Sequence, residues 1–256
     1  MRTAVSPEAR LGFWSATLAT LLSVAYVVAQ LAEWLGWLGS RGGPDNVSTP
    51  LGLVVLLTPS LLLGVAFVVL LVSLHESTPH GQRAWSLAAL AFGVAYAVLI
   101  SMNYFVQLTL VAPRMARGDV AGLEPFLFVP FNSFLYAVDI LGYSFLCLAM
   151  LFAVPLFGRR GLDRAVRGFV LTTGLLLPFL ALQMYYPPLI WIASLWAVTF
   201  PGATWTLAIR FHRVIASNSS GAGASARVPA HADSMTLGGA SHTIDLSGSS
   251  LPRING

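Results

Sequence analysis

Charged residues are what this sequence has least of. Asp, Glu, Arg and Lys make up only 9% of its 256 residues, whereas a water-soluble domain carries roughly 25%. So few charges cannot cover a water-facing surface of this size. Hydrophobic residues make up 56% of the chain and its mean hydropathy is +0.76. The composition therefore predicts an integral membrane protein.

Lysine is absent and cysteine occurs once, as Cys147. All fourteen basic residues are arginines, and they are scattered around the apolar runs. This pattern is typical of topology signals rather than of a phosphate-binding surface. We therefore expect no nucleic-acid partner, although the isoelectric point is near 9.6. A single cysteine also excludes an intrachain disulfide, a CxxC redox pair and a thiolate metal cluster.

Several catalytic and metal-binding motifs are also missing. The sequence has no Walker A loop, no HExxH and no DxxxD pair, which disfavours ATP-driven pumps, zinc proteases and magnesium-dependent prenyl transferases. His75 and His80 stand five residues apart with a proline between them, a spacing that favours a loop role over metal binding. We expect neither a metal nor a cofactor.

Long apolar runs dominate what is present. Each is long enough to cross a hydrocarbon core of roughly 30 Å as a helix. None shows the in-out alternation of a barrel strand. The fold class predicted is all-α, a polytopic membrane protein with six transmembrane helices. The six runs cover about 11–38, 51–74, 84–112, 126–157, 165–186 and 188–211.

The arginines predict an orientation for these six spans. Nine of them fall at the N-terminus, in the second and fourth connections or at the end of the sixth span, and three fall on the opposite side. Because arginine is enriched on the cytoplasmic side, we expect both termini in the cytoplasm and the chain in the inner (plasma) membrane. Residues 214–256 are small, polar and poor in apolar side chains. They predict a disordered cytoplasmic tail after a transmembrane domain of residues 1–213.

Asp139 is the most informative polar residue, because it lies near the middle of the expected fourth span. An Asp at this depth costs roughly 2.5–3.5 kcal/mol on insertion scales and usually faces the bundle interior or a wet cavity. No Lys, Arg or His lies at the same depth. The carboxyl is therefore either neutral or in reach of water and hydrogen-bond donors. A packing role could use a less costly Asn, so Asp139 favours a function.

Helical spacing adds neighbours to Asp139 in the same span. Asn132, Tyr136, Asp139 and Tyr143 stand at i, i+4, i+7 and i+11 in the sequence, which predicts one shared helix face. That face would present a carboxyl, an amide and two hydroxyl groups to the bundle interior.

Other spans repeat this pattern. Tyr96, Asn103 and Gln107 share one expected face of the third span. The first span has Tyr26, Gln30, Glu33 and Trp37 at i, i+4, i+7 and i+11, and Gln183 lies near the end of the fifth. In the expected orientation, the carboxyl and amide residues of this set lie in the outer half of the membrane. This asymmetry predicts a pocket open to the outside, with Asp139 as its deepest member. Interhelical packing explains the amides equally well, and an anchor at the membrane interface is favoured for Glu33.

Residues 103–157 contain two stretches that resemble segments of other membrane proteins. They contain "NYFVQLTLVAP" and then "VPFNSFLYAVDILGY". This segment resembles the central part of uncharacterised bacterial six-span membrane proteins, in which a Gln-Thr-like motif ends one span and a Pro-Asn segment, an acidic residue and LGY fill the next. The resemblance implies the six-span fold and a bacterial source, and it assigns no activity.

Three functions fit these residues. The first is binding or transport of a small or amphipathic ligand that enters from the outer side, with Asp139 as a protonatable site. The second is an intramembrane enzyme that acts on a lipid or isoprenoid, with Asp139 or Glu33 as general acid. The third is a non-catalytic component of a membrane complex. We favour the first, with the lipid bilayer and the ligand as partners; the sequence does not specify an oligomeric state.

Overall fold

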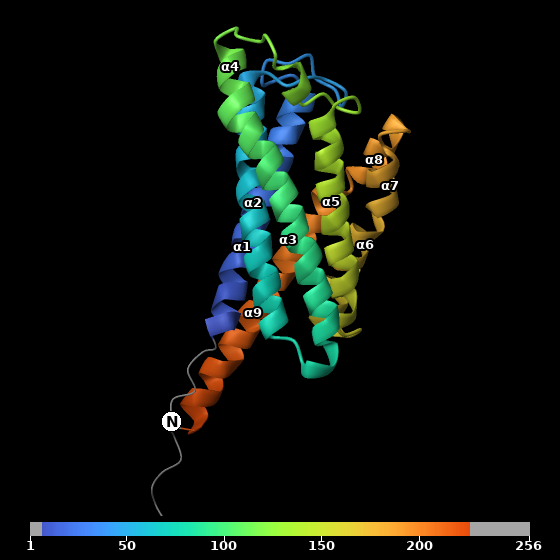
Figure 1. Cartoon of the computed structure of the whole chain (residues 1–256). Helices are drawn as coiled ribbons and strands as arrows, with labels where there is room; N and C mark the ends of the chain where they lie inside the picture. The colour runs from blue at the N-terminus through green and yellow to red at the C-terminus, as the bar shows by residue number, and fades with distance from the viewer. Residues whose placement is uncertain (1–6, 226–256) are drawn as a thin grey trace, which may run out of the picture.

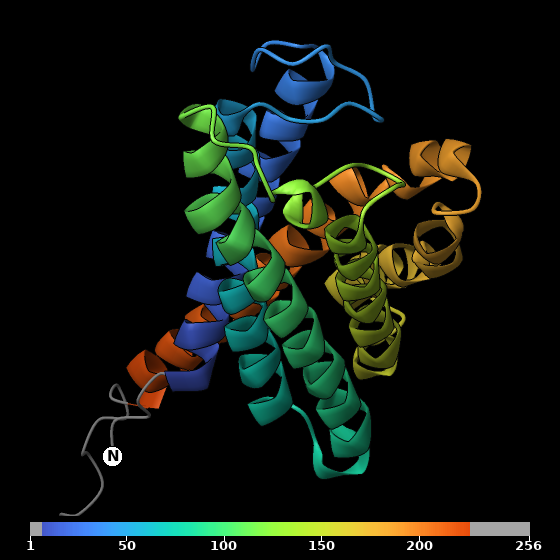
Figure 2. The same ribbon diagram turned by 45° about the horizontal axis from the view of Figure 1, so that its top comes forward.

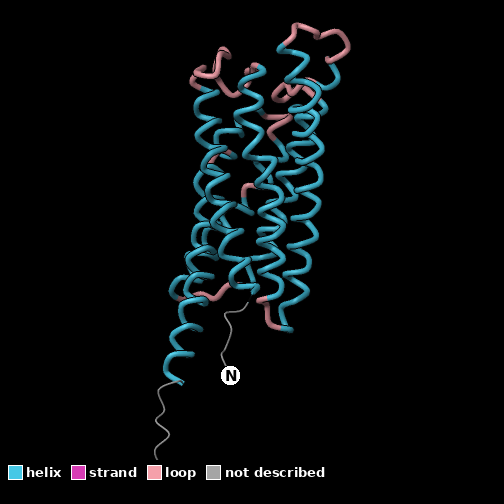
Figure 3. Tube along the Cα trace, turned by 90° about the vertical axis from the view of Figure 1, so that its left-hand side faces the viewer, coloured by secondary structure: helices cyan, strands magenta, loops and turns pink. Residues whose placement is uncertain are grey.

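The computed structural model describes residues 7–225, and side chains up to residue 218. Within these ranges the chain is helical and has no strand (Figure 3). Six helical segments of the described chain are long and apolar enough to cross a membrane, which is consistent with a multi-pass membrane protein. The expected all-α class and the six spans are therefore confirmed. The segments are Pro7–Trp34, Pro50–Glu76, His80–Ala116, Phe134–Leu156, Gly161–Leu182 and Pro187–Asn218.

The individual helices follow these segments closely. They are α1 (Pro7–Trp34), α2 (Pro50–Glu76), α3 (Arg83–Val106), α4 (Ala112–Ala116), α5 (Phe134–Ala153), α6 (Gly161–Leu175), α7 (Leu177–Leu182), α8 (Ile190–Ala193) and α9 (Trp196–Ser225). Helix α9 passes residue 213, where we placed the end of the transmembrane domain. The remainder of the expected tail, residues 226–256, lies outside the described residues.

The six segments close into a ring. Helices α1, α2, α3, α5, α6 and α9 each pack against the next helix in this order, and α9 packs back against α1 (Figure 1). Helix α5 belongs to the most buried of the six segments. We call one end of the bundle proximal: it carries both ends of the described chain and the turn at 77–82 (Figures 1 and 2). The opposite end, called distal, carries the connections 35–49, 117–133 and 183–189.

Glycines allow the close approach of neighbouring helices in this ring. A Cβ atom on Gly12 of α1 would lie 2.5 Å from the ring of Phe211 on α9, and one on Gly93 of α3 would overlap Leu71 on α2. Such contacts are typical of membrane bundles, where small residues let two helix backbones come together.

Two spans are interrupted where prolines remove backbone donors. Pro113 has no N–H for the carbonyl group of Thr109, and a π-helical turn at Gln107–Val111 precedes α4. Pro178 in the same way lacks the N–H that the carbonyl group of Gly174 would meet in a regular α-helix; this carbonyl group instead accepts from the backbone N–H of Leu176, where the chain bends between α6 and α7. The second bend carries the chain to the distal end through short helical turns rather than one straight helix.

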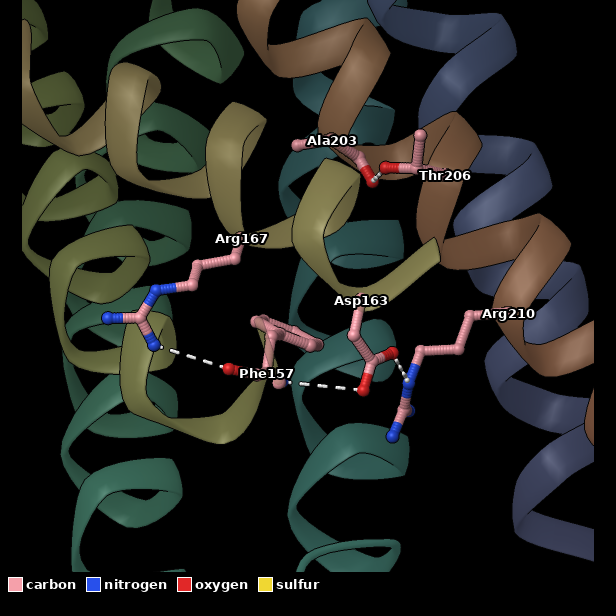
Figure 4. Close-up of polar contacts among 7 residues, drawn as sticks. Phe157, Asp163, Arg167, Ala203, Thr206 and Arg210 are labelled. Atoms are coloured by element: carbon pink, nitrogen blue, oxygen red, sulfur yellow. Dashed lines mark hydrogen bonds and ion pairs between the residues drawn. The ribbon is translucent and has the colours of Figure 1, made fainter. Parts of the chain in front are cut away.

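Polar contacts fasten the proximal end (Figure 4). Arg210 of α9 pairs through Nε with Asp163 Oδ1 of α6 at 3.1 Å, and its guanidinium lies 5.7 Å from the ring centre of Phe157. Arg167 of α6 donates to the carbonyl oxygens of Val154 and Phe157, both at 3.2 Å. Because these contacts join the end of α5 to α6 and α9, they hold the ring closed at this end.

Candidate functional site: a cavity between Asp139 and Glu33

A cavity of about 260 Å³ lies inside the ring. Its walls come from α1, α2, α5, Tyr104 of α3 and the broken segments α7, α8 and α9, and the loop residues 43–48 and 128–130 also line it. These loop residues belong to distal connections (Figure 1). The cavity therefore extends from the bundle interior toward the distal end.

Asp139 lies on the wall that α5 contributes, and only 6% of it is exposed. Asn103 of α3 donates through Nδ2 to Asp139 Oδ1 at 3.5 Å and to the carbonyl oxygen of Leu135 at 3.1 Å. The hydroxyl group of Tyr104 lies beside the same carboxyl group. Asn103 is thus a neighbour that orients Asp139 and does not itself line the cavity.

Tyr136 and Gln183 both line the cavity and are hydrogen-bonded to each other. The Tyr136 hydroxyl donates to Gln183 Oε1 at 3.1 Å, and Gln183 Nε2 donates to the carbonyl oxygen of Leu180 at 3.2 Å. Gln183 comes directly after α7, so the bend at Leu176 and the short α7 determine where this amide lies. The bond ties the fifth span to α5 beside Asp139.

The hydroxyl group of Tyr143 connects α5 to α2 and α3. This hydroxyl lies 3.1 Å from Ser60 Oγ of α2, and the Tyr104 hydroxyl of α3 donates to it at 3.4 Å. The Tyr143 ring meets Trp196 edge to face at 5.6 Å. Of the four residues expected on one face of this span, α5 presents Tyr136, Asp139 and Tyr143 to the cavity.

Glu33 differs from the expectation of an anchor at the membrane interface. It is 3% exposed and lines the cavity, and neither of its carboxyl oxygens has a hydrogen-bond partner among the described residues. The reason is packing: Glu33 lies against Gly52 of α2, which has no side chain to keep the carboxyl group away. Gln30 and Tyr26 lie one and two helical turns before Glu33. The Tyr26 hydroxyl donates to Gln30 Oε1 at 3.2 Å, and both residues line the cavity.

Asn132 does not share the face of α5, so this part of our expectation is wrong. The helix begins at Phe134, because Ser133 caps it by accepting from the backbone N–H of Tyr136 at 3.2 Å. The chain reverses just before, where Phe131 has φ 62°. Asn132 is consequently an exposed loop residue that lines a separate hollow beside α3.

Two further candidates are buried beside the cavity rather than in it. Tyr96 packs edge to face on Phe67 at 5.8 Å, and its ring centre lies 5.7 Å from that of Tyr143. Gln107 is fully buried and donates through Nε2 to the carbonyl oxygen of Phe126 at 2.7 Å. Gln107 thereby fastens a distal loop to the π-helical turn, which is a structural role.

The sequence did not point to Tyr104, Ser60 or Trp196. Tyr104 follows Asn103 directly and so falls off the i, i+7 spacing that identified its neighbour. Ser60 stands one residue after Pro59 in an otherwise apolar run. Trp196 reaches the cavity because the chain breaks between α8 and α9, a break that hydropathy does not reveal.

No family model, no curated protein and no solved structure matches this chain. Residues 7–225 also bring together no group of three or more His, Cys, Asp or Glu side chains that could hold a metal ion. The function proposed below is therefore based on the geometry of the cavity.

Proposed function

We propose that this chain is a bacterial inner-membrane protein that binds or transports a small or amphipathic ligand in the cavity around Asp139. Both termini lie in the cytoplasm in this proposal, because nine arginines belong to the side of the termini and three to the opposite side. The distal end of the bundle then faces the outside of the cell. The lipid bilayer is the surrounding partner.

One observation supports the proposal most strongly. The cavity is continuous from Asp139 to the distal loop residues 43–48. Binding sites for small molecules are typically concave, mostly apolar and equipped with a few polar groups that orient the ligand. Asp139, Tyr136, Gln183 and Glu33 are among such groups in a mostly apolar wall.

The distribution of polar side chains supports an outward-facing site. Charged or amide residues of the cavity come from Glu33, Gln30, Asn46 and Gln183, all near distal connections, and from Asp139. Toward the proximal end the ring is filled by apolar side chains such as Leu146 and Met150, which are at most 2% exposed. A ligand therefore has charged and amide partners along a path from the distal side, and beyond Asp139 the lining offers hydroxyl groups such as that of Tyr143.

Cysteine accessibility tests this proposal. In a Cys147→Ser background, Gln30→Cys and Tyr136→Cys place one thiol in the cavity wall, and Ile100→Cys places one in the packed core, where the side chain is fully buried. A membrane-impermeant maleimide is added to intact spheroplasts. We expect the two cavity cysteines to react and the core cysteine to stay unmodified.

Two positions calibrate the side of the membrane. Arg41→Cys lies in a distal connection and Gly81→Cys in the proximal turn, where a side chain meets no neighbour within 4 Å. The proposal requires that Arg41→Cys reacts from outside and Gly81→Cys only after the membrane is opened. If both cavity cysteines stay unreactive while Arg41→Cys is modified, the cavity is not open to the outside and the proposal fails.

A further inference from the structure

We propose that the cavity binds an organic cation, which the carboxyl groups of Glu33 and Asp139 attract and aromatic side chains of the lining contact. The inference rests on the proposed function, because it names the ligand class of the same site. Four observations carry it: the sign of the charged lining residues, the unpartnered Glu33, the aromatic wall and the unpartnered indole of Trp196.

The charged side chains of the lining all have one sign. Glu33 and Asp139 line the cavity, and no Arg, Lys or His is found among its described lining residues. Two carboxylates in a low-dielectric site attract a cation and repel an anion, since charges are screened far less there than in water. An anionic or phosphorylated ligand would meet no basic side chain in this wall.

The Glu33 carboxyl group has no hydrogen-bond partner among the described residues. Both of its carboxyl oxygens are buried without a hydrogen-bond partner, and the residue is 3% exposed. A buried carboxylate is costly unless it is paired and hydrogen-bonded. Glu33 lines the cavity, and in this proposal a ligand ammonium group supplies the missing charge.

Aromatic rings line the same cavity as the two carboxyl groups. Tyr26 of α1 and Tyr143 of α5 both meet Trp196 edge to face, at 5.7 Å and 5.6 Å between ring centres, and all three line the cavity. Trp34 and Tyr136 extend this wall. Aromatic faces attract cations through the ring quadrupole, Trp most strongly, and groups of such rings recognise alkylated ammonium ions.

Trp196 adds a hydrogen-bond donor to the same wall. Its indole Nε1 is buried and has no acceptor among the described residues. Since Glu33 offers two free acceptors and Trp196 one free donor, the complementary ligand carries a cationic group and an oxygen acceptor. A cavity of about 260 Å³ limits it to a small molecule, so small amino alcohols, including their N-alkylated forms, are the class that fits.

Binding of choline to the purified protein in lipid nanodiscs, measured by calorimetry, tests the inference. Ethanolamine and 1,4-diaminobutane serve as further cations, 3,3-dimethylbutan-1-ol as the neutral isostere of choline, and acetate as the anion. We expect at least one cation to bind, and the isostere to bind at least tenfold more weakly than choline. We expect no binding of acetate.

Substitutions at Glu33 and Asp139 test whether cation binding depends on their carboxyl groups. Glu33→Gln and Asp139→Asn keep the side-chain shape and remove the charge, so each is expected to weaken cation binding at least tenfold. Glu76→Gln makes the same chemical change at an exposed position at the far end of α2 and is expected to leave affinity unchanged. Where a cavity variant fails to fold, Gly52→Ala displaces the Glu33 carboxyl sterically and keeps its charge.

Three results overturn the inference: none of the three cations binds, the neutral isostere binds as tightly as choline, or acetate binds in preference. Equal binding of the isostere and choline leaves the proposed function intact, because a ligand still occupies the cavity. Unreactive cavity cysteines in the accessibility experiment overturn the proposed function itself. The two failures are therefore distinguishable.

Discussion

Replacement of Gly52 by alanine moves the Glu33 carboxyl group without altering any charge. The new Cβ would lie 2.6 Å from Glu33 Oε2 and 3.2 Å from its Cδ, whereas ordinary contacts at a Cβ begin at 3.4 Å. The carboxyl group must therefore shift by about 0.8 Å. Because it is the end of a flexible side chain facing a cavity, it can move away from α2.

The shift is expected to weaken cation binding and to leave the fold intact. Hydrogen bonds to charged groups contribute roughly 1.5–3 kcal/mol, and 1.4 kcal/mol is about a factor of ten in affinity. Loss of good geometry at Glu33 should therefore raise the Kd for choline by about tenfold. Stability should rise slightly, since alanine in place of a helical glycine gains roughly 0.5–1 kcal/mol. Calorimetry in nanodiscs and a thermal unfolding midpoint measure the two effects separately.

Gly64→Ala on the same helix is the matched control. A Cβ there would lie 3.6 Å from Ala97, an ordinary contact, and Gly64 does not line the cavity. This variant should bind choline like the parent protein. If Gly52→Ala also binds choline with unchanged affinity while it folds as well as Gly64→Ala, the position of the Glu33 carboxyl is irrelevant and the reasoning is refuted.

Three further predictions concern the fold around the site. Ser133→Ala removes the N-cap of α5 and should lower unfolding free energy by about 1 kcal/mol; an unchanged midpoint in thermal unfolding contradicts the capping role. Leu146→Ala empties a fully buried position and should cost about 2–5 kcal/mol, whereas Leu141→Ala, at a position 47% exposed, should cost far less; equal losses would place Leu146 outside the core. The hydrogen bonds from Arg114 hold the pKa of the Asp119 carboxyl below its ordinary value, so this pair stabilises the distal loop above about pH 4 and loses its effect as the pH falls through the lowered pKa. Hydrogen exchange of residues 117–123, corrected for intrinsic rates, should show this loss, and the Asp119→Asn variant should not.

Hydropathy predicted the six spans well, because an apolar run of about twenty residues has few alternatives to a membrane helix. It placed helix ends less well. The fourth span was expected to begin at residue 126, yet α5 begins at Phe134, where Ser133 supplies a cap. Apolar loop residues such as Phe128 and Val129 extend the hydrophobic run beyond the helix. Local hydrogen bonds, which hydropathy does not record, determine the boundary.

The candidate site was predictable to the extent that helical spacing applies. Spacing by three and four residues placed Tyr136, Asp139 and Tyr143 on one face, and all three line the cavity. It could not predict which faces of different helices meet. The burial of Glu33 depends on Gly52 of another helix, and Trp196 enters through a break between α8 and α9. Both depend on tertiary packing.

Protection of a cavity cysteine by a bound cation would show directly that the cation occupies this cavity. The rate at which an impermeant maleimide modifies Gln30→Cys, in the Cys147→Ser background, is measured in spheroplasts with and without choline. At a choline concentration ten times its Kd, occupancy of the site should slow modification about tenfold, and the neutral isostere at the same concentration should slow it far less. If choline at that concentration leaves the rate unchanged, it does not occupy the cavity between Glu33 and Asp139, and the account is contradicted.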